Sequence, residues 1–438
     1  MMRTPIAVLL FTLAPLSLAA QPVASRLTLA DAIARAFETS HRLAEGRARE
    51  QGAQAALKGV QAGDKPMVVV SAGYTRTNHV EEFAFGQGSA RSVVYPDIPD
   101  NFATRLSMQW PIYTSGRVDA LERAATAEAQ AVSADIETSR ADLRFEVVRA
   151  YWAAATAREA VRVLEESAAR ADAQLRDARL RFDVGLIPPN EVSSLEAQRS
   201  REQAQLIEAS NLRESAFIEL RRLTGAAEES VVELADSLDT TVAGAQDSTA
   251  LVREAFDQRP ERKALTLRIG GIEARQQAAE TGNKPVVAVG AGVDYANPNQ
   301  RIFPRKGEWQ ESWDLSVNVS WPFFDFGRTK AQVAEIAAVA LATRERLAEF
   351  DSVVSADVRQ RLLDLDSSQA MVRAASEAVR SATDARRVVG DRFTAGVATS
   401  TDVIVAQVAL LENELARTRA LAGVRLAEAR LHRVLGRP

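Results

Sequence analysis

The chain has 438 residues, 46% of them hydrophobic and only 6% aromatic, and it contains no cysteine. This composition indicates a folded, largely helical protein and excludes disulfides, thiolate metal sites and cysteine nucleophiles. The 54 basic and 58 acidic residues form no block of one sign, so no nucleic-acid partner is expected. Because the three histidines are far apart in sequence, we also predict no enzyme activity, no metal site and no cofactor.

Residues 1–20 predict a secretory signal peptide. Arg3 supplies the positive charge, an apolar stretch runs from Ile6 to Leu18, and Ala19 and Ala20 complete a small-residue cleavage site. The apolar stretch is shorter than the roughly 18–20 residues that a membrane-spanning helix needs. We therefore expect an exported protein without an inner-membrane helix.

Two halves of the remaining chain align with each other almost without gaps. Lys65-Pro66 matches Lys284-Pro285 at a shift of 219 residues, and Arg181-Phe182 matches Arg392-Phe393 at a shift of 211. A duplicated unit of this length predicts two similar modules and not a solenoid. The expected organisation is a first repeat over 21–225, a linker over 226–248 with a local acidic run, and a second repeat over 249–438.

Each repeat opens with helical apolar spacing. In the first repeat this spacing covers 27–63, weakens near Ser40-His41 and so predicts a short helix followed by a longer one. A proline-free stretch from Thr114 to Asp183 then predicts a helix on the order of 100 Å long. The second repeat has the same stretch from Phe326 to about Gly396. On helices alone, a coiled-coil rod is an equally good interpretation.

Between these helices the apolar period changes from 3.6 to 2, which predicts β-hairpins at about 67–111 and 286–322. One face of each strand is apolar and the other is small or polar. A sheet packed on a globular core is one interpretation, and a transmembrane β-barrel is the other. Aromatic residues near the strand ends favour the barrel, with these expected to form membrane girdles: Tyr74, Trp110, Tyr295, Trp313 and Trp321.

Four strands are too few to enclose a lumen, and an open sheet edge cannot lie in lipid. Several chains must then share one barrel, and three copies would supply twelve strands. The long helices turn at Gly185 and Gly396, where glycine can take the left-handed conformation that ends a helix. After the first turn, Pro188 and Pro189 stop the helix, and Asn190 is expected to cap the returning helix. The returning helices are expected over 190–224 and 401–435.

Three features of the sequence are informative together: the two-fold repeat, the Trp-Pro strand ends followed by Gly-Arg, and the Arg-Phe-x-x-Gly turns. Their order and spacing resemble those of the TolC-like outer-membrane efflux proteins. The resemblance covers Leu27 to Gly436. It implies a mixed α/β membrane protein, a homotrimer whose twelve-stranded barrel continues into a periplasmic tunnel of helices. It also implies a place in the outer membrane of a Gram-negative bacterium, contact with outer-membrane lipid, and two partners, a periplasmic adaptor and an inner-membrane transporter.

The resemblance also implies positions for docking and constriction. Two turns match the adaptor-docking tips of the family: Val184, Gly185 and Leu186 in the first, and Ala395, Gly396 and Val397 in the second. Family tunnels narrow near the tip, often at acidic rings, which makes Asp177, Asp384 and Asp391 candidates for a pore constriction. Because arginines alternate with these aspartates, a solvated helix face is the competing interpretation for most of them.

The leading functional hypothesis is a passive exit duct of a tripartite efflux pump for drugs or other toxic compounds. The sequence has no phosphate-binding Gly-x-x-x-x-Gly-Lys motif, so a partner must supply the energy. An outer-membrane channel for type I protein secretion is the alternative within this class. A soluble periplasmic coiled-coil scaffold is the alternative from another class.

Overall fold

The computed structural model describes residues 25–227, 232–239 and 247–437. The predicted signal peptide and parts of the predicted linker lie outside these residues. The chain divides into two compact units. The first unit is made of 1–40, 142–245 and 361–431, and the second of 41–141, 246–360 and 432–438.

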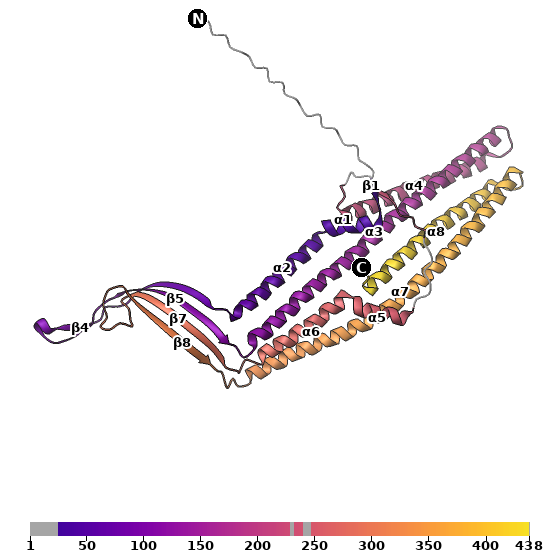
Figure 1. Cartoon of the computed structure of the whole chain (residues 1–438). Coiled ribbons are helices and arrows are strands. Elements are labelled where there is room, and N and C mark those ends of the chain that lie inside the picture. The colour runs from indigo at the N-terminus through magenta and orange to yellow at the C-terminus, as the bar shows by residue number, and fades with distance from the viewer. Residues whose placement is uncertain (1–24, 228–231, 240–246, 438) are drawn as a thin grey trace, which may run out of the picture. The chain divides into compact units, whose positions relative to one another are not determined.

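The sheet of the second unit has four antiparallel strands in the order β2-β5-β7-β8 (Figure 1). Strand β2 covers Met67–Arg76 and β5 covers Asp100–Tyr113, while β7 covers Val286–Asn297 and β8 covers Gln310–Ser320. Two hairpins, one from each repeat, therefore join side by side through β5 and β7. Both hairpins lie where the change of apolar period predicts them.

The two faces of this sheet differ sharply in polarity. The register aligns Val70, Leu106, Val293 and Trp313 in one row across all four strands, and each of these side chains is 47–75% exposed. The opposite face carries small and polar residues such as Ser71, Ser107, Gly290 and Ser316, among others. An apolar face this exposed to water is costly, so the sheet is built for contact with lipid or protein.

The segment 77–99, which connects β2 to β5, contains a small hairpin that the sequence analysis does not anticipate. It pairs β3, Phe83–Phe85, with β4, Ser92–Tyr95, through an irregular register. The strands are too short to show a reliable alternation. Its side chains Phe83 and Phe85 are more than half exposed and meet edge to face at 4.9 Å.

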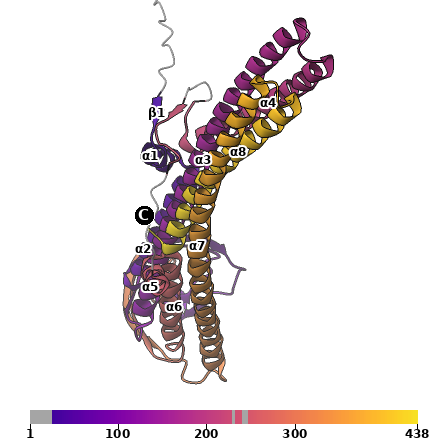
Figure 2. The same cartoon turned by 90° about the vertical axis from the view of Figure 1, so that its right-hand side faces the viewer.

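Two pairs of long helices repeat with equal lengths. Helix α3, Arg117–Asp183, and helix α7, Arg328–Thr394, each have 67 residues. Helix α4, Pro189–Thr224, and helix α8, Ser400–Leu435, each have 36. Figures 1 and 2 show α4 returning along α3 and α8 returning along α7. All four starting residues keep the 211-residue shift of the duplication.

The shorter helices precede the strands in each repeat. The predicted break near Ser40-His41 is confirmed, because α1 covers Leu29–Thr39 and α2 covers His41–Gln61. A capping box between Thr28 and Asp31 starts α1. In the second repeat, α5 covers Ser248–Gln258 and α6 covers Pro260–Ala279.

The predicted linker contains a strand that sequence reasoning missed. In the first unit, β6, Val232–Leu234, pairs in parallel with β1, Ser25–Leu27. The fully buried Tyr151 hydroxyl lies 3.0 Å from the Leu27 carbonyl oxygen and 2.8 Å from the Asp236 carboxylate. It also accepts the backbone N–H of Asp236 at 3.2 Å. Burial raises the pKa of Tyr151 to about 12. The linker is thus fixed to α3 by a polar contact.

Glycine ends both returning helices in the left-handed conformation, at Gly225 with φ 64° and at Gly436 with φ 73°. A β-carbon on Gly225 would lie 2.8 Å from the Thr39 side chain at the end of α1. A β-carbon on Gly436 would lie 2.9 Å from the backbone of Gln258 at the end of α5. Each returning helix therefore ends against the short helix of its own repeat, and only glycine fits there without strain.

Candidate functional site

The two turns that join the long helices have the same geometry. Gly185 and Gly396 both have φ 76°. The N–H of Leu186 donates to the Arg181 carbonyl at 2.8 Å, and the N–H of Val397 donates to the Arg392 carbonyl at 2.9 Å. With a second bond from each glycine N–H, this is the Schellman motif that closes a helix C-terminus. The predicted left-handed glycines are confirmed.

The starts of the returning helices differ between the two repeats, and one prediction is wrong. Asn190 does not cap α4, because the helix begins one residue earlier, at Pro189, with no side-chain cap bond from Pro188. Proline suits the first helical position, since its φ is already helical and it lacks an N–H to satisfy. In the second repeat, Thr399 and Asp402 form reciprocal capping bonds, and the backbone N–H of Thr399 lowers the pKa of Asp402.

The turn residues present apolar side chains to solvent. Val184 is 69% exposed, Leu186 is 73% exposed and Val397 is 63% exposed. Beneath the first turn, buried Leu175 and Leu195 pack with Ile187 and with a side chain from α8. The first turn is thus packed from below, while the outer surface of both turns is apolar. Such a surface is typical of a protein-docking site.

The three candidate constriction residues are all exposed on α3 or α7. Asp177 pairs with Arg181 at 2.9 Å, and Asp384 lies 3.8 Å from Arg387. Both contacts are within one helix, as expected for a solvated helix face. In the first unit, Arg181 also stacks on the Phe393 ring at 5.0 Å and donates to its carbonyl oxygen at 3.3 Å. That arginine therefore ties α3 to α7 near the turns.

A buried polar cluster in the first unit was missed by sequence reasoning. The Glu202 side chain, only 1% exposed, accepts hydrogen bonds from Ser167 and Gln198, both at 2.9 Å. Gln407 on α8 donates to the Ser167 carbonyl at 3.4 Å. The sequence does carry a signal for this cluster. Leu195, Glu202 and a buried alanine at 209 are spaced by seven residues, which places the Glu202 carboxylate at a core position of α4. The cluster connects α3, α4 and α8.

Four of the five aromatic residues predicted to line the membrane lie at the two ends of the sheet, and Trp313 lies nearer its middle. At the end next to the helices, the indole N–H of Trp110 donates to the Asp64 carbonyl at 2.9 Å, and that of Trp321 donates to Asn283 at 3.0 Å. At the other end, Tyr74 donates to Asp100, and Tyr295 stacks on Trp309 with ring centroids 4.9 Å apart. Trp313, in one row with Leu106 near the middle of β5, is 75% exposed.

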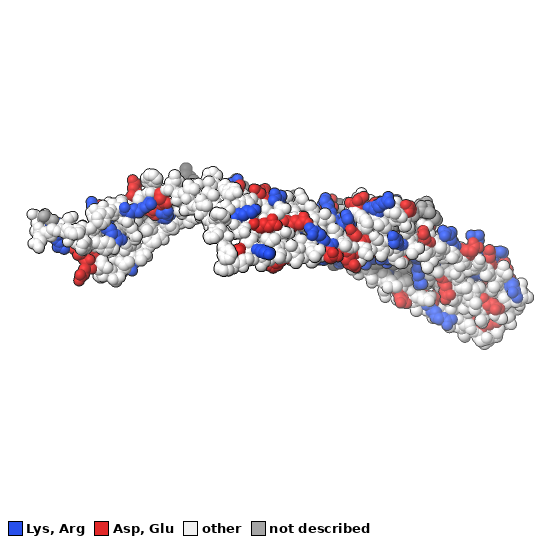
Figure 3. All heavy atoms as spheres, turned by 90° about the horizontal axis from the view of Figure 1, so that it is seen from below, with Lys and Arg blue, Asp and Glu red and all other residues white. Residues whose placement is uncertain are grey.

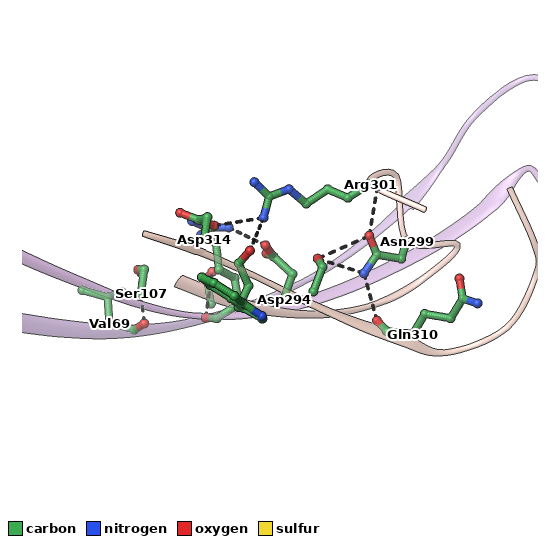
Figure 4. Close-up of polar contacts among 11 residues, drawn as sticks. Val69, Ser107, Asp294, Asn299, Arg301, Gln310 and Asp314 are labelled. Atoms are coloured by element: carbon green, nitrogen blue, oxygen red, sulfur yellow. Dashed lines mark hydrogen bonds and ion pairs between the residues drawn. The ribbon is translucent and has the colours of Figure 1, made fainter. Parts of the chain in front are cut away.

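A second cluster that sequence reasoning missed lies on the polar face of the sheet (Figure 4). We call Arg105, Asp294, Asp314 and Arg301 the outer-end cluster. Arg105 on β5 donates to Asp294 on β7 at 2.5 Å and to Asp314 on β8 at 2.8 Å. Arg301, from the loop 298–309 between β7 and β8, lies 3.6 Å from Asp314. The alternating strand pattern places these side chains on one face, but it does not specify that they meet.

Charge elsewhere is mixed. On the face drawn in Figure 3, acidic and basic side chains are interspersed along the helices. In the described ranges, no three side chains of metal-binding type come together as a metal site. No described helix is long and apolar enough to cross a membrane.

Comparison with known proteins assigns this fold to a family. The profile of the outer membrane efflux protein family matches residues 32–226 and 251–437, one match in each repeat. The chain therefore belongs to the outer membrane efflux protein family. Its predicted location, the outer membrane of a Gram-negative bacterium, is confirmed, and a soluble periplasmic scaffold is excluded.

Individual relatives agree with this assignment. The outer membrane protein TolC of Vibrio cholerae is 28% identical over 286 residues, which span 64% of each chain. The solved outer-membrane channel OprN is 18% identical with a TM-score of 0.77, covering 94% of this chain and 90% of that one. The open-state MtrE outer membrane channel of Neisseria gonorrhoeae is 19% identical with a TM-score of 0.76, covering 93% and 89%. The predicted TolC-like fold is confirmed.

Proposed function

We propose that this protein is the outer-membrane exit duct of a tripartite efflux pump, through which small toxic molecules leave the cell passively. The observation that carries the proposal is the sheet of β2, β5, β7 and β8. Its apolar face is exposed over all four strands, and it continues directly into helices of 67 residues. A lipid-facing sheet attached to helices of that length suits a conduit that crosses the membrane and extends into the periplasm.

The duct is a homotrimer in this proposal. Strands β2 and β8 are the two edges of the sheet, and each needs a partner strand if the sheet lies in lipid. Pairing of β8 with β2 of the next copy satisfies both edges, and three copies close a barrel of twelve strands. The signal peptide over 1–20, the linker and the two repeats complete the proposed domain organisation.

Opening of the duct is assigned to the first unit. Arg170 on α3 pairs with Glu414 on α8 at 3.1 Å, and Arg181 contacts Phe393 on α7. These contacts and the buried Glu202 cluster hold the two helix pairs together. A partner that binds the turns and separates the pairs would widen the passage between them, and the aspartates at 177, 384 and 391 remain candidates for lining it. Nothing in this step consumes energy within the chain itself.

The exposed turns are the proposed docking site for a periplasmic adaptor, which in turn connects to an inner-membrane transporter. An adaptor with apolar side chains at its own tip fits the exposed Val184, Leu186 and Val397. The left-handed glycines at 185 and 396 fix the backbone of these turns, so that the apolar side chains are presented in a constant arrangement. Preformed sites of this kind lose little entropy on binding.

Deletion of the gene tests the efflux function. We expect the deletion strain to accumulate dyes and drugs, and to recover when the chain is restored. Fractionated membranes should contain the protein in the outer fraction, as a detergent-extracted particle with the mass of three chains. Unchanged drug sensitivity together with loss of a secreted protein from the medium would favour protein secretion. A monomer in the outer-membrane extract would contradict the shared barrel.

Polar substitutions at the turns test docking. Leu186→Ser combined with Val397→Ser should abolish efflux while leaving trimer mass and outer-membrane location unchanged. Ile207→Ser on α4, where the wild-type side chain is 57% exposed, is the matched control and should retain efflux. Normal efflux by the turn variant would show that the turns are not the docking surface.

A further inference from the structure

The loop between β7 and β8 is folded onto the polar face of the sheet. Asn299, only 2% exposed, donates to the Gln310 carbonyl and to the Ser312 hydroxyl, both at 3.0 Å. Its side-chain oxygen accepts the backbone N–H of Arg301 at 3.0 Å. Ser312 and Asp314 alternate with Trp313, which belongs to the apolar face. These bonds therefore direct the loop toward the polar side of the strands (Figure 4).

Arg301 and Arg305 attach the loop at two further points. The Arg301 guanidinium donates to the Trp313 carbonyl at 2.7 Å and lies 3.6 Å from Asp314. Arg305 donates to the Tyr95 hydroxyl at 2.8 Å and stacks over its ring at 5.1 Å. A cavity of about 640 Å³ lies over the polar face at Thr75 and Asn101, bordered mainly by the 77–99 segment and on the loop side by Gln300 and Arg305. The loop and the 77–99 segment, joined by Arg305 and Tyr95, thus border this space together.

The strands beneath are shaped to receive this arrangement. Arg105 spans β7 to reach Asp314, and a β-carbon at position 292 would lie 2.3 Å from its guanidinium. A side chain at position 292 would therefore force the Arg105 guanidinium off this path. Asp314, which Arg105 orients, is also the carboxylate that Arg301 faces. The loop therefore binds to charged side chains that are already positioned by the three strands β5, β7 and β8.

We propose that the outer-end cluster and the loop 298–309 form an outer gate, which sets the size limit for molecules that pass between the duct and the exterior. This inference rests on the proposed function, because the polar face must line the lumen. With three copies around one axis, three such loops would narrow the outward end of the barrel. The gate is independent of the turns at the far ends of α3 and α7.

Thiol labelling of intact cells tests this gate, because the chain has no cysteine of its own. Gln109→Cys places one thiol on the polar face, four residues and about 13 Å along β5 from Arg105. Two membrane-impermeant maleimides are compared, a small sulfonated one and one carrying a 5-kDa polyethylene glycol chain. Ser89→Cys, at an exposed position of the 77–99 segment, reports whether the large reagent reaches the assembled protein at the cell surface.

The cluster is then weakened by Arg301→Ala, with Lys306→Ala as the control that removes the same charge from the same loop. We expect the small reagent to label Cys at 109 in every background. The large reagent should label it on the order of tenfold faster in Arg301→Ala, as expected for loss of one charged hydrogen bond. Labelling in Lys306→Ala should equal that of the intact cluster.

Three results would overturn the gate. The large reagent labelling position 109 rapidly with the cluster intact would show an open outer end. Equal exclusion from Arg301→Ala, with position 89 still labelled, would show that the cluster does not hold the gate. Failure of the small reagent in every background would mean that the polar face is closed to the exterior, and the duct function itself would then be refuted.

Discussion

Tyr151 offers a direct test of how the linker is held to the long helix α3. Tyr151→Phe removes a hydroxyl that lies within 3.2 Å of three polar atoms on Leu27 and Asp236, and it leaves the backbone N–H of Asp236 without that acceptor. One buried N–H that loses its acceptor costs about 1–3 kcal/mol. We therefore expect the variant to lose about 2 kcal/mol of stability at neutral pH.

The raised pKa of Tyr151 makes the stability of the folded protein depend on pH. Burial raises that pKa from 10.0 to about 12 in the folded protein. A shift of two pKa units corresponds to about 2.7 kcal/mol. Because the folded-state pKa is above the unfolded value, this stability is fully present below pH 10 and is lost as the pH rises from 10 to 12. The wild type should therefore lose stability above pH 10, whereas Tyr151→Phe, which has no ionisable group at this position, should not.

Thermal unfolding of the detergent-purified protein, followed by far-ultraviolet circular dichroism, measures both effects. The melting temperature of Tyr151→Phe should lie below that of the wild type at pH 8, and the difference should shrink above pH 10. Tyr74→Phe, at a hydroxyl that is exposed on the sheet, is the control and should change little. Equal melting temperatures for Tyr151→Phe and the wild type at pH 8 would refute the reasoning.

Three further substitutions, two of them paired with a comparison substitution, probe other parts of the fold by the same melting assay. An alanine in the left-handed conformation costs about 1–2 kcal/mol. Gly225→Ala should destabilise the protein by more than this, because its β-carbon would also clash with the end of α1. Gly185→Ala has open space around it and should show only the cost of the left-handed backbone. The pKa of Glu261 is lowered because bonds from two arginines outweigh the effect of its burial. Ionised Glu261 should therefore stabilise the folded protein above pH 4.5, and this stabilisation should disappear as the pH falls. Glu261→Gln should abolish this pH dependence. Trp321→Phe should lower the stability by about 0.5–1.5 kcal/mol, because the indole N–H bond to Asn283 is lost. A smaller loss of stability than that of Trp313→Phe would contradict a stabilising role for this bond.

Much of the fold was predictable because its signals are long or repeated. Proline-free stretches define α3 and α7, and the period-2 alternation defines the hairpins that contain β5 and β8. The strands β1 and β6 were not predictable, since three residues carry no measurable period. Asn190 was misassigned because proline at position 189 begins the helix without a polar cap.

The functional residues were predictable only in part. The left-handed glycines of the turns are fixed by local backbone geometry, and so local sequence reveals them. The outer-end cluster depends instead on the register of three strands, which brings Arg105 to Asp294 and Asp314 from positions 189 and 209 residues away. Gly292 was the available hint, since a glycine within a strand often marks close approach of another group.

The exposed apolar face of the sheet has a consequence for the synthesis of the protein. The long helices are compatible with water, but the row through Val70, Leu106, Val293 and Trp313 is not. Until it is inserted in the outer membrane, each chain presents an adhesive surface and two unpaired strand edges to water. Chains that accumulate before insertion are therefore expected to aggregate.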